Sequence, residues 1–97
     1  MENGDPSSET KKQAEEFKAQ ANDYFKKEKF ASAEEFYTKA IDLDATNPVY
    51  FANRSIAHLK QESFGYALSD ASKAIELDSS YIKAYYRYIF NFLNLAS

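Results

Sequence analysis

Two pairs of polar side chains, each spaced four residues apart, have the types needed to bind a carboxylate. Lys18 and Asn22 form the first pair, and Lys83 and Arg87 form the second. Residues four apart share one face of an α-helix, so each pair presents its donors on one side. Lysine and arginine make charge-assisted hydrogen bonds to carboxylates, and asparagine donates to carboxylate or peptide oxygens. With Asn53 from the middle of the chain, the set offers three cations and two amides to one anionic ligand.

The elements that would position these residues follow from an internal repeat of 34 residues. Several residues recur at this interval: Phe17, Phe51 and Tyr85; Ala33 and Ala67; Ala40 and Ala74; Ile41 and Ile75; Leu43 and Leu77; Asp44 and Asp78; and the small pair Ala21 and Ser55. Small residues let two helices approach closely, and the aromatic residues fill the space beside them. A period of 34 with two helices in each unit is typical of the tetratricopeptide repeat, in which neighbouring units stack into a solenoid.

Amphipathic spacing predicts five helices along the chain. Capping boxes at Thr10–Gln13 and Ser32–Glu35 suggest where the first two begin. Asn47 is expected to cap the third helix, with Pro48 in its first turn. The third helix is predicted over 48–60, the fourth up to Leu77, and the fifth over the rest of the chain.

The predicted fold is therefore an all-α solenoid of antiparallel helix pairs. A flexible leader, 1–9, precedes one tetratricopeptide-repeat domain, 10–97. Repeat one covers 14–47, repeat two covers 48–81, and a partial third repeat covers 82–97, which makes two and a half repeats. The first helices of successive units line a concave groove, and this places the five polar residues around one concavity. Their charge-assisted bonds, reduced by the cost of ordering a peptide, predict a roughly micromolar complex.

Composition excludes several other classes of protein. The net charge is −3, whereas nucleic-acid-binding domains are usually basic. The chain has no cysteine, which removes disulfides and thiolate metal sites, and it has no apolar run long enough to span a membrane. It also has no secretory signal, so a cytoplasmic or nuclear protein is expected. Its one histidine, His58, falls at the repeat position of Tyr24 and is interpreted as a packing residue, so no catalytic residue, metal ligand or cofactor is predicted.

Four strings carry a resemblance to a known family: "AEEFKAQANDYFK", "NRSIAHL", "FGYALSDASKAIELD" and "YIKAYYR". Lys18, Asn22, Asn53, Lys83 and Arg87 match the carboxylate clamp of chaperone-binding tetratricopeptide domains. The resemblance implies a co-chaperone module that holds the C-terminal Glu-Glu-Val-Asp tail of the ninety-kilodalton heat-shock chaperones, with the seventy-kilodalton class as a second candidate. The finer resemblance is to the regulatory domain of the type 5 serine/threonine phosphatases.

The chain departs from this family after Arg87, where it reads "YIFNFLNLAS". Ile89 stands where the first two repeats have Ala21 and Ser55. The strings of a metallophosphatase catalytic domain are missing, so we expect no enzyme activity in this chain. The ending is interpreted as the result of alternative splicing or an altered gene model. As an alternative function, this aromatic last helix would mediate self-association or another protein contact through Tyr85, Tyr86, Tyr88, Ile89, Phe90, Phe92, Leu93 and Leu95.

Overall fold

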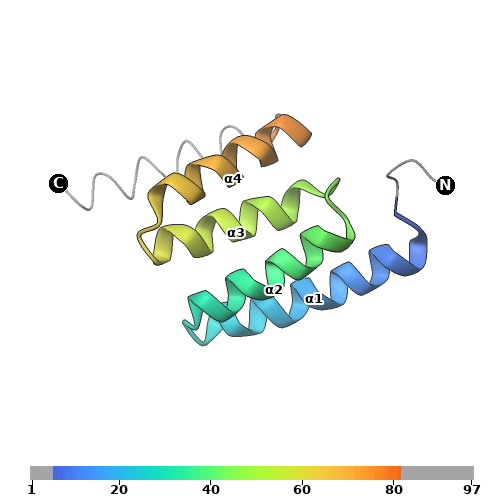
Figure 1. The fold of residues 1–97 in the computed structure, drawn as a ribbon, viewed down its shortest axis with the longest axis horizontal. Helices are drawn as coiled ribbons and strands as arrows, with labels where there is room; N and C mark the ends of the chain where they lie inside the picture. The colour runs from blue at the N-terminus through green and yellow to red at the C-terminus, as the bar shows by residue number, and fades with distance from the viewer. Residues whose placement is uncertain (1–5, 82–97) are drawn as a thin grey trace.

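The computed structural model describes residues 6–81, and within this range the chain is all-α. The helices are α1 (Ser8–Lys26), α2 (Phe30–Leu43), α3 (Pro48–Lys60) and α4 (Phe64–Leu77). Helices α1 and α2 form one antiparallel pair, α3 and α4 form a second, and α2 also packs on α3 (Figure 1). The predicted fifth helix lies outside the described residues.

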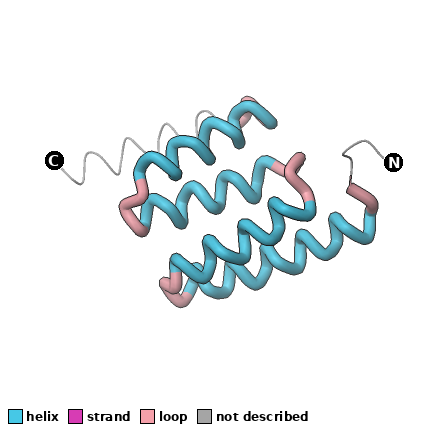
Figure 2. Tube along the Cα trace, in the orientation of Figure 1, coloured by secondary structure: helices cyan, strands magenta, loops and turns pink. Residues whose placement is uncertain are grey.

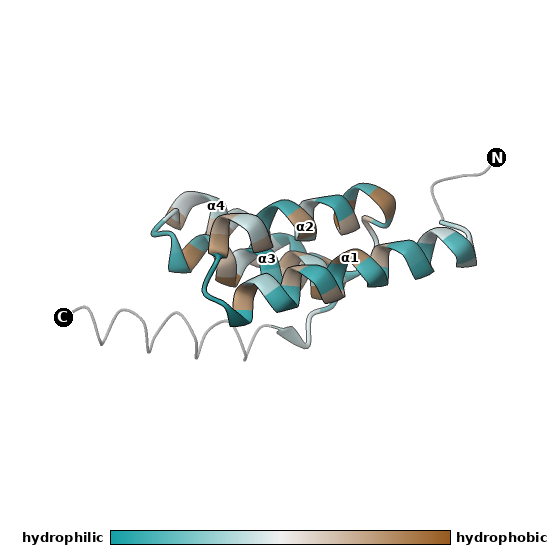
Figure 3. Ribbon diagram, turned by 90° about the horizontal axis from the view of Figure 1, so that it is seen from below, coloured by the Kyte–Doolittle hydropathy of each residue, from teal (hydrophilic) through white to brown (hydrophobic). Residues whose placement is uncertain are grey.

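Short turns join the four helices, as Figure 2 shows. Viewed along another direction, α2 and α4 lie in an upper layer and α1 and α3 in a lower one, and apolar and polar stretches alternate along each helix (Figure 3). The first helices of the two pairs therefore share one side of the molecule. None of the helices in residues 6–81 is long and apolar enough to cross a membrane.

Small side chains allow the two layers to approach closely. Ala14, Ala21, Ala33 and Ala40 are fully buried, as the repeat pattern predicts for the small positions. Ser55, the counterpart of Ala21 in the second repeat, is also buried and donates from Oγ to the Ala67 carbonyl at 2.7 Å. A hydroxyl can replace a methyl group at this position because a backbone oxygen of the partner helix satisfies it.

The helix starts agree with the sequence in α3 and differ in α1 and α2. Asn47 Oδ1 accepts from the Val49 amide at 2.9 Å and Pro48 is in the first turn, which confirms the predicted cap. Helix α1 begins earlier than its predicted box, because Ser7 Oγ accepts from the Thr10 amide at 3.1 Å. Helix α2 begins at Phe30 without a side-chain cap, so the predicted box at Ser32–Glu35 is wrong. Sequence spacing alone does not reveal which of several polar residues is at the helix boundary.

The turn within each helix pair uses the same left-handed residue. Glu28 and Glu62 have φ values of 60° and 61° and are 34 residues apart. After α1, the Lys29 amide bonds to the Tyr24 carbonyl and the Glu28 amide bonds to the Phe25 carbonyl, both at 2.9 Å. This is the Schellman arrangement, in which glycine is the preferred residue at the left-handed position.

Glycine at this position is expected to stabilise the chain. Glu28→Gly should raise the free energy of unfolding by about 0.5 kcal/mol, because the relief of left-handed strain exceeds the entropy that glycine adds to the unfolded chain. Urea titration followed by circular dichroism measures the change. Lys29→Gly, at a φ of −96°, is the matched control and should destabilise. Equal losses from both changes would contradict the prediction.

Candidate peptide-binding site

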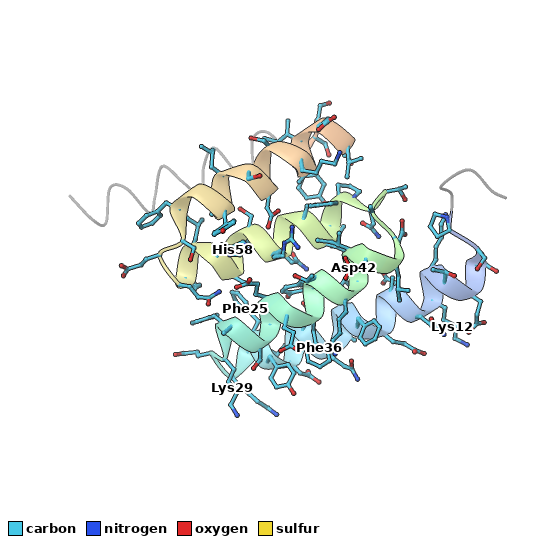
Figure 4. All side chains as sticks on the ribbon, in the orientation of Figure 1. Lys12, Phe25, Lys29, Phe36, Asp42 and His58 are labelled. Atoms are coloured by element: carbon cyan, nitrogen blue, oxygen red, sulfur yellow. The ribbon has the colours of Figure 1, made fainter. Side chains whose placement is uncertain are left out.

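A shallow groove runs between α1 and α3, with α2 contributing to its floor. Its pocket has a volume of about 290 Å³ and is lined by Asn22, Phe25, Lys26, Tyr37, Asn53 and Ile56. The structure thus brings together two of the predicted site residues, Asn22 and Asn53, from two different repeats. Figure 4 shows Phe25 at the boundary between the first helix pair and α3.

The amide of Asn22 is oriented by a tyrosine from the neighbouring helix. Tyr37 donates its hydroxyl to Asn22 Oδ1, and the Tyr37 residue is buried. Burial raises the pKa of Tyr37 to about 12, so the hydroxyl keeps its proton and remains a donor at neutral pH. Because Oδ1 is occupied, the Nδ2 group of Asn22 is left to donate to a ligand.

Lys18 lies one turn before Asn22 on α1 and has an acidic partner. Its Nζ is 3.0 Å from Glu15 Oε1, and the hydroxyl of Tyr50 donates to Glu15 Oε2. The hydrogen bond from Tyr50 lowers the pKa of Glu15, and the bond from Lys18 lowers it further. Glu15 is therefore ionised at neutral pH, and an incoming carboxylate would compete with it for Lys18. The interpretation of Lys18 from sequence overlooked this acid three residues earlier.

Of the other three predicted site residues, only Lys18 lies within residues 6–81. Lys18 is on the same helix as Asn22 but does not line the pocket itself. Lys83 and Arg87 lie outside the described residues. The pocket adds Lys26, Phe25, Tyr37 and Ile56, which sequence reasoning did not include. Two of these could have been found from the sequence by their spacing to Asn22, because Lys26 is four residues after it and Ile56 is 34 residues after it.

Comparison with known proteins agrees with this arrangement of helices. A scan of protein-family models finds no match. A solved structure described as the second TPR of Spaghetti (RPAP3) bound to HSP90 peptide SRMEEVD is 37% identical, with a TM-score of 0.75, and the match covers 89% of this chain and 84% of that one. This chain belongs to the tetratricopeptide-repeat family. A second tetratricopeptide structure, the second TPR domain of human RPAP3 in complex with HSP70 peptide SGPTIEEVD, is 40% identical over 77% of this chain and 62% of that one, with a TM-score of 0.73.

Among curated proteins, the tetratricopeptide chain is similar to serine/threonine-protein phosphatase 5 of Rattus norvegicus. The two are 55% identical over 82 residues, which is 84% of this chain and 16% of the phosphatase. The chain thus spans about one sixth of the length of that relative, and the match is to its tetratricopeptide region. The predicted resemblance to type 5 phosphatases is confirmed over these residues, and the 97 residues contain no catalytic phosphatase domain.

Proposed function

We propose that this tetratricopeptide chain binds the acidic C-terminal tail of a heat-shock chaperone of the ninety-kilodalton class in the groove between α1 and α3. The observation that carries the proposal is that Asn22 and Asn53, from different repeats, line one pocket together with Lys26. The apolar Phe25 and Ile56 in the same lining suit a peptide that has an apolar side chain next to acidic ones. Two tetratricopeptide structures similar to this chain are described as bound to peptides ending in Glu-Glu-Val-Asp.

The proposed clamp consists of Lys18, Asn22, Asn53, Lys83 and Arg87. In it the two amides donate to the terminal carboxylate, and the cations neutralise the acidic groups around it. A chaperone tail of the seventy-kilodalton class is the second ligand. The proposal includes a cytoplasmic and nuclear location and, in a longer protein, a role in targeting a phosphatase to the chaperone.

Isothermal titration calorimetry with the peptide Met-Glu-Glu-Val-Asp tests the proposal. We expect a roughly micromolar dissociation constant that rises with salt, because the contacts are ionic. A peptide with an amidated C-terminus is the control and should bind much more weakly. If the amidated peptide binds equally well, the carboxylate is not the recognised group and the proposal is wrong.

Lys26 extends the proposed site toward the upstream part of the peptide. It lies four residues after Asn22 on α1, or about 6 Å along the helix axis. An extended peptide covers that distance in about two residues. We therefore expect Lys26 to attract an acidic side chain about two positions before the terminus.

Replacing Lys26 tests this extension of the groove. Lys26→Ala should weaken binding about two- to fivefold, the usual effect of one exposed ion pair. The adjacent Lys27→Ala is the matched control and should leave the affinity unchanged, because Lys27 does not line the pocket. Replacing the upstream glutamates of the peptide by glutamine should remove the difference between Lys26→Ala and the parent. If Lys26→Ala still binds the glutamine peptide more weakly than the parent does, Lys26 does not pair with the upstream glutamates.

Self-association through the aromatic residues after Arg87 is a separate prediction. Sedimentation over a range of concentrations tests it, and a constant monomer mass would exclude it.

A further inference from the structure

A second pocket lies between α2, α3 and α4 and shares no lining residue with the peptide groove. Its volume is about 460 Å³, and its lining includes Glu34, Arg54, His58, Tyr66 and Asp70. A space of this size is in the range of small-ligand sites. Figure 4 shows His58 between α3 and α4, at the position of this pocket.

Three of the five N–H donors of the pocket's one arginine already have partners. Arg54 donates from Nε to Asp70 Oδ2 at 2.7 Å and from Nη2 to Asp70 Oδ1 at 2.8 Å. Its Nη1 donates to Thr38 Oγ1 at 3.1 Å. Each guanidinium nitrogen therefore has a partner, which disfavours an anionic ligand.

Carboxylates outnumber cations around this arginine. The pKa of Arg54 is raised first by its hydrogen bond with Asp70 and then by the charges of Asp70, Glu34 and Asp42, against an opposing effect of burial. Only one of these acids is needed to neutralise the guanidinium. Glu34, the remaining carboxylate of the lining, leaves the pocket with an excess of one negative charge, which favours a cation.

The Nδ1 nitrogen of His58 is buried and has no hydrogen-bond partner among the described residues. The His58 side chain is 9% exposed. Nδ1 lies 3.7 Å from Glu34 Oε1, while Nε2 lies 3.5 Å from Asp70 Oδ2. In a neutral imidazole whose Nε2–H faces Asp70, Nδ1 is an acceptor that faces another acceptor. Glu34 Oε1 already accepts from Gln61 Nε2 at 2.9 Å, so Nδ1 is the atom that lacks a partner, and a donor that reached it would satisfy it.

Tyr66 adds an exposed aromatic surface beside these acceptors. Its ring stacks on the His58 imidazole with 5.4 Å between ring centroids, and the residue is 71% exposed. The face of a tyrosine ring attracts a cationic group, and a planar guanidinium can stack on it.

We propose that this pocket binds a basic side chain, arginine or lysine, of a protein partner. The N–H groups of that side chain donate to the Glu34 carboxylate in place of Gln61 Nε2, and to His58 Nδ1 once this exchange opens access to it. Its stem lies against Tyr66. The chain would thereby carry two docking surfaces of opposite preference, one for acidic tails and one for basic side chains.

The test is a nuclear magnetic resonance titration of the ¹⁵N-labelled 97-residue chain with acetyl-Gly-Arg-Gly-amide. This probe has no free carboxylate, so it lacks the group proposed to enter the peptide groove. We expect saturable shifts centred on Glu34, His58 and Tyr66, with a millimolar dissociation constant. The analogue with citrulline in place of arginine has nearly the same shape without the charge and should bind at least tenfold more weakly. Equal binding of both probes, or no saturable shift in these residues, would overturn the proposal.

Two glutamates on α2 provide a matched pair of variants. Glu34→Gln should weaken arginine binding at least threefold, whereas Glu35→Gln, at the adjacent exposed position, should not change it. Equal weakening by both would mean that only general surface charge is sensed, and the proposal would be wrong.

Saturating the groove with a Glu-Glu-Val-Asp peptide should leave the arginine affinity unchanged. Competition between the two probes would contradict two separate sites, while failure of the acidic peptide alone to bind would affect only the proposed chaperone function.

Discussion

Asp70→Asn is expected to lower the free energy of unfolding by about 3 kcal/mol. The Asp70 side chain is 8% exposed and accepts two hydrogen bonds from Arg54 in a bidentate pair. An asparagine in its place accepts through one oxygen only and leaves a largely buried guanidinium without its counterion. Loss of one partner of a buried ion pair is costly because the remaining charge is no longer compensated. Urea unfolding followed by circular dichroism measures the loss.

Asp42→Asn is the matched control for this change. Asp42 is exposed on α2 and acts on Arg54 only at a distance, so its replacement should cost less than about 0.5 kcal/mol. Arg54→Lys should fall between the two, since lysine keeps the charge and cannot form the planar fork. If Asp70→Asn and Asp42→Asn destabilise the chain equally, the bidentate pair contributes little to stability.

The second large effect is expected for Asn22→Asp in peptide binding. Aspartate has the size of asparagine and can still accept the Tyr37 hydroxyl bond. It replaces the Nδ2 donor by a negatively charged acceptor, which would face the terminal carboxylate of the peptide. Loss of a charge-assisted hydrogen bond and the added repulsion together should weaken binding at least about thirtyfold, or about 2 kcal/mol. Calorimetry with Met-Glu-Glu-Val-Asp gives the ratio of dissociation constants.

A second variant separates local repulsion from a change in net charge. Gln20→Glu adds the same charge to the exposed surface of α1, and Gln20 does not line the groove pocket. It should weaken binding less than about threefold, the scale of a screened long-range charge. A circular dichroism spectrum identical to that of the parent would show that Asn22→Asp keeps the helices. If both variants lose a comparable amount of peptide affinity, Asn22 is not a carboxylate ligand.

Features that repeat along the chain were predictable from the sequence. The 34-residue interval predicted the helix pairs, and the small residues Ala21 and Ala33 are buried as expected. Asn47 with Pro48 gave the start of α3 because a cap and a proline together leave few alternatives. Single capping boxes were weaker evidence, and the real boundaries of α1 and α2 depend on Ser7 and on the left-handed turn at Glu28.

The repeat pattern could not predict the contacts between helices. The Tyr37 bond to Asn22 and the Tyr50 bond to Glu15 join residues 15 and 35 positions apart, and no local spacing indicates them. Lys26 was visible as a neighbour of Asn22 on one helix face, but only the fold shows that Ile56 and Asn53 complete the same pocket. The pairing of Lys18 with Glu15 shows that both the third and the fourth neighbour must be checked on a helix.

Arg54 has a further consequence for how the chain unfolds. Its bonds to Asp70 lie within the second repeat, whereas its bond to Thr38 crosses to the first. In a linear array of units coupled only to their neighbours, such a bond belongs to the interface energy rather than to either unit. A single side chain thus links the intrinsic stability of repeat two to its coupling with repeat one. The amide protons of α2 and α4 should consequently exchange with solvent in one concerted opening. Thr38→Val should weaken this coupling without abolishing it, because the Tyr50 bond to Glu15 also joins the two repeats.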